Sequence, residues 1–408
     1  MSWREIELGD AIHVKHGFAF KGEHFSDNGT HIVLTPGNFN EQGGFRLRPG
    51  KDRFYASDIP QDFILSQGDL IIAMTEQGPG LLGSSALIPQ DDRFLHNQRL
   101  GLVEICDKTV LDREYLYHLF NTKNVRAQIS GSASGTKVRH TAPERIYRVK
   151  VRIPPNVSEQ SRIAQVLSAY DDLIENNRRR IRLLEEAARL LYREWFVHLR
   201  FPRHEHVAVV GGVPEGWGRK KISDVCETVG GGTPSTNVAE YWDGEITWVV
   251  PTDVTRNDSL VLLDSERKIT EKGLRESSAR MVPAETILMT SRASVGFFAL
   301  VDRPVCTNQG FINIIPHQNE LRMYLLFNLM NRVEEIRGNA KGSTYPEISK
   351  GRFREMDVLI PPARLVDEFG RVATNIIDQV RSLKRMTLQL SKARDLLLPK
   401  LMNGELAA

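Results

Sequence analysis

Residues 162–195 read RIAQVLSAYDDLIENNRRRIRLLEEAARLLYREW, and the spacing of the apolar residues in this stretch decides the fold. Every three or four positions an apolar residue recurs, which predicts a long helix with one buried edge. This seam consists of Ile163, Leu167, Tyr170, Ile174, Asn177, Ile181, Leu184, Ala188, Leu191 and Trp195. A single helix of this kind is not stable alone, so the chain needs a partner for it.

A second seam with the same spacing lies near the C-terminal end of the sequence. Its members are Val366, Phe369, Ala373, Ile376, Val380, Leu383, Thr387, Leu390, Arg394, Leu397 and Leu401. We expect the two helices to pack antiparallel as a coiled coil, and we expect Pro399 to break or kink the end of the second one. The polar Asn177 either fixes the register of this pair or is a tolerated imperfection.

The sequence before each helix is repeated once. VRIPP at 151–155 returns as VLIPP at 358–362, and YHLFN at 117–121 returns as YLLFN at 324–328, both at an offset of 207 residues. Gly135 and Gly342 keep the same offset, and Asn97-Gln98 matches Asn308-Gln309 after small indels. Strand-like apolar runs broken by turn residues precede each repeat. The chain is therefore two copies of a unit of about 200 residues.

These patterns predict a mixed α/β (α+β) fold with an internal pseudo-twofold repeat. Two similar globular domains are separated by two long antiparallel helices. The expected boundaries are a first domain at 1–156, a first spacer helix at 157–199, a linker at 200–214, a second domain at 215–362 and a second spacer helix at 363–408.

The composition is that of an ordinary globular protein. Hydrophobic residues make up 41% of the chain and the net charge is only +3, so a nucleic-acid surface would have to be a local patch. No apolar run is long enough to span a membrane, and the N-terminus does not resemble a secretory signal. The three cysteines are scattered, which favours a reducing, cytoplasmic location.

Two similar globular domains on a rigid spacer suit a ligand with two separated parts. The first seam covers 33 residues. A helix of that length is roughly 50 Å long, or about one and a half turns of B-DNA. Because the two domains differ in sequence, we expect an asymmetric site made of two different half-sites and a spacer that is not recognised.

Several local motifs resemble one known family. They are KHGFAFK at 15–21, GVPEGW at 212–217, GGTPST at 231–236, YWDGEITW at 241–248 and RDLLLPKLMNGE at 394–405. Their order and duplication resemble the specificity (S) subunits of type I restriction–modification systems over nearly the whole chain. The first copy departs from the pattern because it lacks the Gly-Gly-Thr-Pro string.

The resemblance implies a non-catalytic subunit with two target recognition domains that bind double-stranded DNA. The spacer helices would dock two methyltransferase (M) subunits, which methylate adenine N6, and restriction (R) subunits would join them. S-adenosylmethionine, ATP and magnesium would be used by those partners, with no cofactor bound directly by this chain and no membrane partner. Consistent with this, the sequence contains no Asp/Asn-Pro-Pro-Tyr/Phe string, phosphate-binding loop or metal motif.

Two glycine-containing loops at the same place in the two copies are candidates for DNA contact. The first offers Thr136, Lys137 and Arg139; the second offers Lys341, Ser343, Thr344 and Tyr345. Hydroxyl, amide and cationic side chains can bond base edges and phosphates. The alternative interpretation is an ordinary solvated loop.

Further candidates lie at strand ends and turns. Gln98 and Arg99, with Gln309 in the second copy, have side chains that suit adenine and guanine, although Asn97 and Asn308 beside them favour a turn-stabilising role. Ser291 and Arg292 follow an apolar run at the place where the first copy has Thr75-Glu76-Gln77. Arg46 and Arg48 belong to a basic, phenylalanine-containing cluster that either contacts phosphate or is simply solvated.

Three other functions remain possible at this point. A specificity subunit of another bipartite restriction–modification system would share every feature above. A coiled-coil scaffold protein would explain the helices but not the duplicated, diverged domains. An enzyme that fuses restriction with methylation would need a catalytic constellation that the sequence does not contain.

Overall fold

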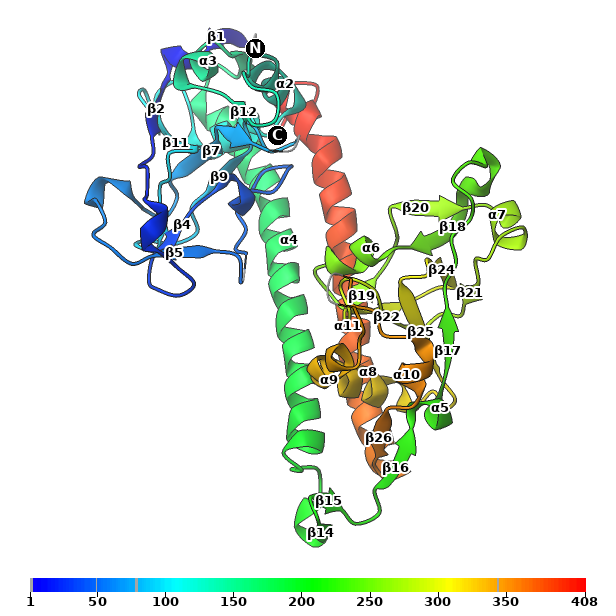
Figure 1. Cartoon of the computed structure of the whole chain (residues 1–408). Coiled ribbons are helices and arrows are strands. Elements are labelled where there is room, and N and C mark those ends of the chain that lie inside the picture. The colour runs from blue at the N-terminus through cyan, green and yellow to red at the C-terminus, as the bar shows by residue number, and fades with distance from the viewer. Residues whose placement is uncertain (1–2, 49, 78–79, 343–344) are drawn as a thin grey trace. The chain divides into compact units, whose positions relative to one another are not determined.

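The structure is a computed structural model that describes residues 3–48, 50–77, 80–342 and 345–408. The chain forms two compact units (Figure 1). Unit 1 comprises residues 1–174 and 390–408, and unit 2 comprises residues 175–389. The long helices α4 (Val157–Tyr192) and α11 (Ala363–Met402) each contribute one part to both units. As predicted, the fold is mixed α/β.

Unit 1 is built on an antiparallel sheet of order β2-β11-β7-β9, with a second sheet of order β3-β5-β4-β10-β6. The strands of the first sheet are β2 (Ile12–His16), β11 (Leu100–Ile105), β7 (Leu70–Ala73) and β9 (Ser85–Leu87). Those of the second are β3 (Phe25–Ser26), β5 (Arg53–Tyr55), β4 (Ile32–Val33), β10 (Phe94–Leu95) and β6 (Ile64–Leu65). Two further pairs are β1 (Arg4–Glu7) with β13 (Lys150–Ile153), and β8 (Thr75–Glu76) with β12 (Arg139–His140). The helices are α1 (Arg113–Phe120), α2 (Lys123–Gly131) and α3 (Pro143–Tyr147).

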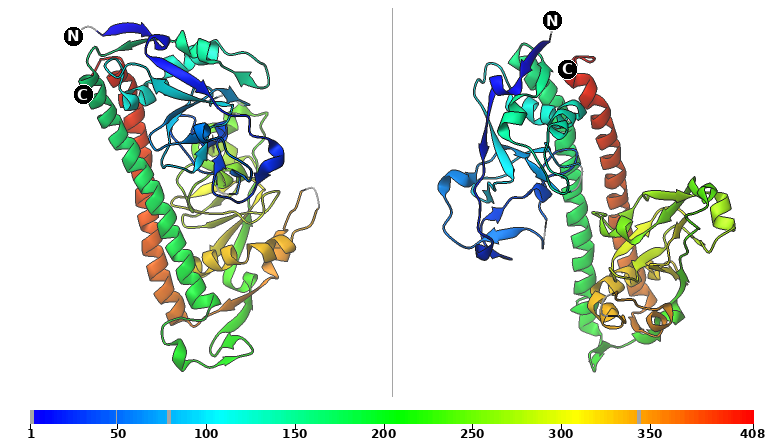
Figure 2. Two further views of the ribbon diagram at one scale, coloured as in Figure 1. Left: turned by 90° about the vertical axis from the view of Figure 1, so that its left-hand side faces the viewer. Right: turned by 45° about the horizontal axis from the view of Figure 1, so that its top comes forward.

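Unit 2 has one sheet of order β17-β25-β22-β23-β19 and another of order β20-β18-β24-β21. Figure 2 shows the ribbon of this unit in green to orange. The strands of the first are β17 (Cys226–Gly230), β25 (Phe311–Pro316), β22 (Ile287–Thr290), β23 (Phe298–Val301) and β19 (Val261–Leu262). Those of the second are β20 (Arg267–Ile269), β18 (Trp242–Val249), β24 (Val305–Thr307) and β21 (Met281–Val282). Two further pairs are β14 (Val209–Val210) with β15 (Val213–Pro214), and β16 (Gly218–Lys221) with β26 (Asp357–Ile360). The helices are α5 (Ile222–Val225), α6 (Pro251–Thr255), α7 (Glu271–Arg275), α8 (Leu321–Asn331), α9 (Val333–Gly338) and α10 (Lys350–Arg354).

The two units repeat one topology, which confirms the internal repeat. Strands β2-β11-β7-β9 correspond in order to β17-β25-β22-β23, and β5-β4-β10-β6 correspond to β20-β18-β24-β21. Even the exceptional parallel pairing recurs, since β4 runs parallel to β10 and β18 runs parallel to β24. In both units the strand before the double proline, β13 or β26, leads into a long helix.

The predicted seams are buried as expected. In unit 1 Ile163 and Leu167 of α4 belong to the same core cluster as Leu401 and Met402 of α11. In unit 2 the core cluster contains Ile181, Ala188 and Tyr192 of α4 and Phe369, Ala373 and Ile377 of α11. Within each unit, therefore, the two helices cover each other's apolar edge in antiparallel orientation. Some predicted members are only half-buried, and next to Ile376 it is Ile377 that is fully buried. The half-buried members are Tyr170, Leu184, Leu191 and Trp195 in the first seam and Ile376, Thr387, Leu390, Arg394 and Leu397 in the second.

Pro399 does not end the last helix. α11 continues to Met402, although proline has no N–H to donate to the carbonyl four residues earlier. The turn after Pro399 carries Leu401 and Met402, which are 3% and 6% exposed and pack in the core of unit 1. Burial of these two side chains offsets the lost hydrogen bond.

Equivalent positions on the long helices carry different chemistry in the two units. Aligning Ile163 with Phe369, a difference of 206, makes Asp171 equivalent to Ile377 and Arg394 equivalent to Ala188. Asp171 and Arg394 form an ion pair of 2.6 Å in unit 1. Ile377 and Ala188 are fully buried in the core of unit 2. The repeat therefore preserves geometry and not polarity.

Replacement of Asn177 by leucine should stabilise the protein. Asn177 is 3% exposed, its Nδ2 has no hydrogen-bond partner among the described residues, and its equivalent in α11 is Leu383. A buried donor without a partner costs about 1–3 kcal/mol. We expect Asn177→Leu to raise the thermal unfolding midpoint and Asn177→Asp to lower it. A lower midpoint for Asn177→Leu would show that the amide stabilises the helix pair.

Candidate nucleic-acid interface

Three segments that are distant in sequence lie side by side at one end of the main sheet of unit 1. They are the strand end 74–76, the turn 97–99 and the loop 134–141, and we call them the unit 1 cluster. The Met74 N–H donates to the Arg99 carbonyl at 3.0 Å, and the Thr141 N–H donates to the Met74 carbonyl at 2.9 Å. Backbone hydrogen bonds thus bring most of the predicted contact residues of the first copy together.

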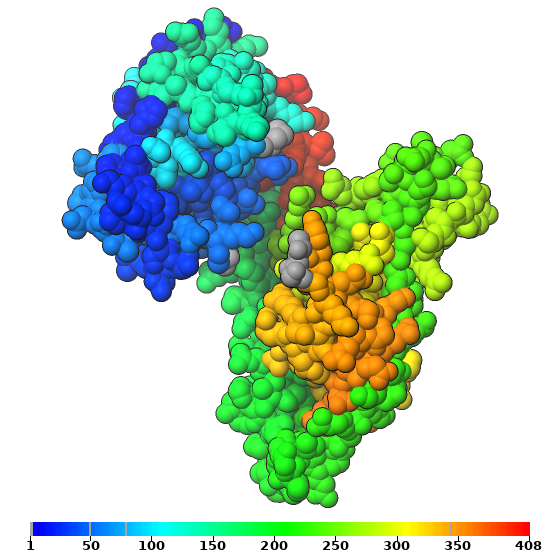
Figure 3. Space-filling model, in the orientation of Figure 1, coloured from blue at the N-terminus to red at the C-terminus, as the bar shows by residue number. Residues whose placement is uncertain are grey.

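Unit 2 builds the same arrangement from 291–293, 308–310 and the described residues 341–342 and 345–348, which we call the unit 2 cluster. The Ser291 N–H donates to the Gly310 carbonyl at 2.8 Å, and the Ile348 N–H donates to the Ser291 carbonyl at 3.1 Å. Ser291 therefore occupies the place of Met74. In Figure 3 the orange part of the surface of unit 2 contains the described residues of the third segment.

Both loops are closed in the same way. Ser134 and His140 exchange backbone hydrogen bonds of 3.0 and 2.8 Å, and Lys341 and Glu347 exchange two of 2.8 Å. The second position of each loop is a glycine with φ of +99° or +98°. At the first of these glycines, Gly135, a Cβ atom would lie 2.0 Å from the Val138 carbonyl oxygen. Only glycine allows this turn, which explains why it recurs.

The asparagine of each turn is structural, as the sequence favoured. Asn97 Oδ1 accepts from the Arg99 N–H at 3.0 Å, and Asn308 Oδ1 accepts from the Gly310 N–H at 2.9 Å. A glycine backbone also approaches each turn closely. A Cβ atom on Gly17 would lie 2.2 Å from the Asn97 carbonyl oxygen, and one on Gly231 would lie 2.1 Å from that of Asn308. The first copy thus keeps this close approach without the Gly-Gly-Thr-Pro string.

The side chains of the unit 1 cluster fall into two groups. Gln98, Arg99, Thr136 and Lys137 are exposed, and their side chains make no hydrogen bond or ion pair with the described residues. Arg139 is half-buried, donates to the Ser130 carbonyl and pairs with Glu76 at 3.2 Å. The first group is available to a ligand, whereas Arg139 holds the loop against the strand end.

The unit 2 cluster has a different set of side chains. Lys341 and Tyr345 are exposed, and Gln309 accepts a hydrogen bond from the Thr233 hydroxyl. Ser291 is buried, and Arg292 is paired with Glu347 at 2.7 Å. The predicted contacts Ser343 and Thr344 lie outside the described residues. Two clusters with one backbone geometry therefore present unlike surfaces.

Arg46 and Arg48 belong to a separate segment, 36–52. Arg46 Nε donates to the Gly37 carbonyl at 2.9 Å, and the Arg48 guanidinium lies against Gly37. The interleaved Phe45 and Phe54 pack on a core cluster of unit 1. Among the described residues, no hydrogen bond or ion pair joins this segment to the three segments of the unit 1 cluster, so the two groups of predicted contacts are distinct.

Glu76 is an organising residue whose importance the sequence did not reveal. Its side chain is 3% exposed. Oε2 accepts hydrogen bonds from the N–H groups of Gly80, Leu81 and Leu82 at 2.9–3.1 Å. Oε1 accepts one from the Arg139 guanidinium. One carboxylate thus joins the strand end, the following loop and the glycine loop. The only sequence signal was an acidic residue directly after a buried strand.

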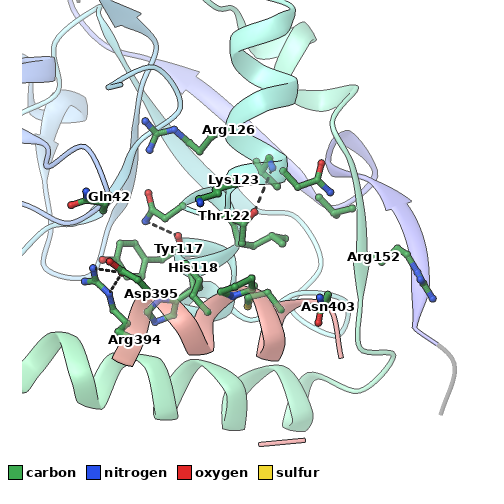
Figure 4. Close-up of a pocket in the computed structure, with 18 of the residues that line it drawn as sticks. Gln42, Tyr117, His118, Thr122, Lys123, Arg126, Arg152, Arg394, Asp395 and Asn403 are labelled. Atoms are coloured by element: carbon green, nitrogen blue, oxygen red, sulfur yellow. Dashed lines mark hydrogen bonds and ion pairs between the residues drawn. The ribbon is translucent and has the colours of Figure 1, made fainter. Parts of the chain in front are cut away.

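A cavity of about 1050 Å³ lies elsewhere in unit 1, between the α1–α2 segment and the last turns of α11 (Figure 4). The Tyr117 hydroxyl donates to Asp171 at 3.4 Å, beside the Asp171–Arg394 pair. His118 is 3% exposed, and its Nε2 lies 3.1 Å from the Ser168 hydroxyl. Burial, together with the Arg394 charge, lowers the pKa of His118 to about 3. The imidazole is therefore neutral at pH 7.

Sequence comparison now identifies the family. Residues 1–186 and 214–382 match the family described as type I restriction modification DNA specificity domain. The chain belongs to this family. It is therefore a DNA specificity subunit of a type I restriction–modification system, which is a recognition subunit and not a catalytic one.

Two curated relatives illustrate the similarity. The MjaIX specificity subunit of Methanocaldococcus jannaschii is 37% identical over 185 residues, a match that covers 45% of this chain and 43% of that protein. The chain thus spans less than half of that relative's length. The HindI specificity subunit of Haemophilus influenzae is 21% identical over 408 residues. This match covers 84% of this chain and 87% of that protein.

The fold of this specificity subunit is also that of a solved structure. The crystal structure of the type I restriction–modification S subunit from M. genitalium has a TM-score of 0.63 at 16% identity, over 98% of this chain and 96% of that one. Among the described residues, no helix has the length and apolarity of a membrane span, and no group of three His, Cys, Asp or Glu side chains could hold a metal ion.

Replacement of His118 by leucine, the residue at the equivalent position 325, should reduce the acid sensitivity of the subunit. The unfolded chain protonates this histidine near its ordinary pKa of about 6.5, whereas the folded one does so only near 3. Stability is therefore lost as the pH falls below about 6.5. Between pH 7 and pH 5 the free energy of unfolding should fall by roughly 2 kcal/mol less in His118→Leu than in the unsubstituted chain. Urea unfolding at the two pH values measures this, and equal losses would contradict it.

Substitution of Glu76 by glutamine should disturb only the unit 1 cluster. Glutamine keeps the shape but offers one carbonyl oxygen in place of the two that now accept four bonds. We expect increased proteolytic cleavage of the segment 76–82 and of the loop 134–141. A suitable control is Glu347→Gln, which alters the pair with Arg292 in unit 2. If Glu76→Gln were cleaved at the same rate as the unsubstituted chain, the proposed role of Glu76 would be refuted.

Proposed function

We propose that this subunit recognises an asymmetric, two-part DNA site with an unrecognised spacer. The unit 1 cluster would contact one half-site and the unit 2 cluster the other. The observation that carries the proposal is the duplication of one backbone arrangement with unlike exposed side chains. Equal geometry suits two segments of the same duplex, and unlike side chains suit two different base sequences.

The proposed contacts divide by chemistry. Lys137 and Lys341 carry exposed charges that suit phosphate, and their contribution would depend on salt. Gln98, Arg99 and Gln309 suit base edges in the major groove, with Thr136 and Tyr345 beside them on the glycine loops. Arg139 and Arg292 would act mainly by holding their loops, because each is already paired with a carboxylate. Arg46 and Arg48 would be peripheral phosphate contacts.

The partners follow from the family. In this proposal, two methyltransferase subunits dock on the long helices and methylate adenine N6 at the site, and restriction subunits complete the complex. S-adenosylmethionine, ATP and magnesium would serve those subunits. No cofactor of this chain enters the proposal.

Methylation mapping tests the two-part site directly. Cells with this chain and its partner methyltransferase should methylate adenine N6 on both strands of one interrupted motif, and cells without this chain should not. Exchange of residues 1–156 for those of another family member should alter one half of the motif only. Methylation that does not depend on this chain would refute the proposal and leave a helical scaffold as the alternative.

Two matched substitutions test the assignment of each cluster. Gln98→Ala should relax base preference in one half-site and Gln309→Ala in the other, each by about 1–3 kcal/mol in discrimination. Lys137→Ala should weaken binding to all sequences. It should also reduce the slope of log affinity against log salt concentration by an amount that corresponds to roughly one phosphate contact. Binding by the assembled complex to duplexes with single base changes measures both effects. If the glutamine substitutions affected the same half-site, the assignment would be wrong.

A further inference from the structure

A left-handed backbone position in unit 2 is occupied by a glutamate. Glu285 has φ of +65°, a conformation that favours glycine. Its N–H donates to the Val301 carbonyl at 2.8 Å, just as the N–H of Gly68 in unit 1 donates to the Ile88 carbonyl at 2.9 Å. Gly68 has φ of +81°. The same turn therefore carries glycine in one copy and a strained glutamate in the other.

The carboxylate of Glu285 joins the sheet to two helices. Oε1 pairs with Arg381 of α11 at 2.8 Å, and Oε2 pairs with Arg322 of α8 at 3.4 Å. Both arginine side chains are nearly buried, at 15% and 16% exposure. Ion pairs that are largely removed from water are screened less than surface pairs, and charge-assisted bonds to arginine are directional.

Neighbouring residues of the long helices contact residues beside strands β19 and β23. On α11, Lys384 pairs with Asp258 at 3.1 Å and Arg385 pairs with Asp302. On α4, the buried Glu185 accepts from the Leu260 N–H at 2.6 Å. The strained turn is thus one of several charged contacts between the rest of unit 2 and the long helices.

Unit 1 does not reproduce the contact that the Glu285 carboxylate makes with the two arginines. Gly68 has no side chain, and its carbonyl accepts from Arg113 of α1 at 3.2 Å. The α4 residue equivalent to Arg381 is Glu175, which has the opposite charge and pairs with Arg182. Unit 1 builds the same turn with the less strained residue, so the turn itself does not require the glutamate of unit 2.

We propose that Glu285 is a positioning residue for the second half-site. By fixing the sheet of unit 2 against α8 and α11, its carboxylate sets the angle at which the unit 2 cluster is presented from the helices. That angle determines which spacer length the subunit accepts between the half-sites. This inference rests on the proposed two-part site.

Glu285→Gly separates positioning from folding, because glycine relieves the left-handed strain while it removes both ion pairs. The full complex with its methyltransferase is given duplexes with the natural spacer and with spacers one base pair longer or shorter. The variant should discriminate between these spacers at least roughly fivefold less than the unsubstituted complex. Its base preference in both half-sites should be unchanged. Arg381→Met should give the same result.

Glu334→Gln is the matched control, since it removes an exposed carboxylate of unit 2 that pairs with Arg337 on α9. It should leave spacer discrimination unchanged. Undiminished discrimination in Glu285→Gly would overturn the inference, and so would a loss of base preference in the second half-site, which indicates a general structural role. Absence of any two-part motif with the unsubstituted chain would instead refute the proposed function itself, before a variant is tested.

Discussion

The apolar edge of each long helix must be covered along its length, and the rest of the molecule depends on this requirement. α4 and α11 satisfy it by pairing within both units, where Leu167 lies in one core and Ala188 in the other. Each globular domain then adds its own helices and sheet to the same core. The sheets that carry the two clusters consequently share a core with the long helices, which suits sites that need fixed geometry.

The duplicated framework tolerates large changes in side-chain chemistry. Two positions of the long helices carry an ion pair, Asp171 with Arg394, where the other copy has fully buried Ile377 and Ala188. One turn position is Gly68 where the other is Glu285. By contrast, Gly135 and Gly342 are both retained because a Cβ atom would collide with the loop backbone. Backbone constraints are therefore kept in both copies, whereas paired side chains change together.

The sequence predicted the elements that depend on local periodicity. Both seams, the repeat, the mixed fold class and the asparagine turns were recognisable because spacing of three and four, or a single Asx bond, is a local property. The continuation of α11 beyond Pro399 was not, because the burial of Leu401 and Met402 that offsets the lost hydrogen bond comes from distant residues of unit 1. The clusters themselves were only partly predictable. Their segments were individually identified, but the hydrogen bonds that align residues 74, 99 and 141 connect parts of the chain that no local pattern relates.

The composition of the two units has a consequence for how the protein is made. Unit 2 is continuous, from 175 to 389, whereas unit 1 needs residues 390–408 in addition to its first 174. A ribosome adds those residues after all of unit 2, so Ile163 and Leu167 lack the cover of Leu401 and Met402 until unit 2 has been synthesised. The domain synthesised first is thus the domain completed last, and a chain released prematurely would carry a finished second domain beside an open first one.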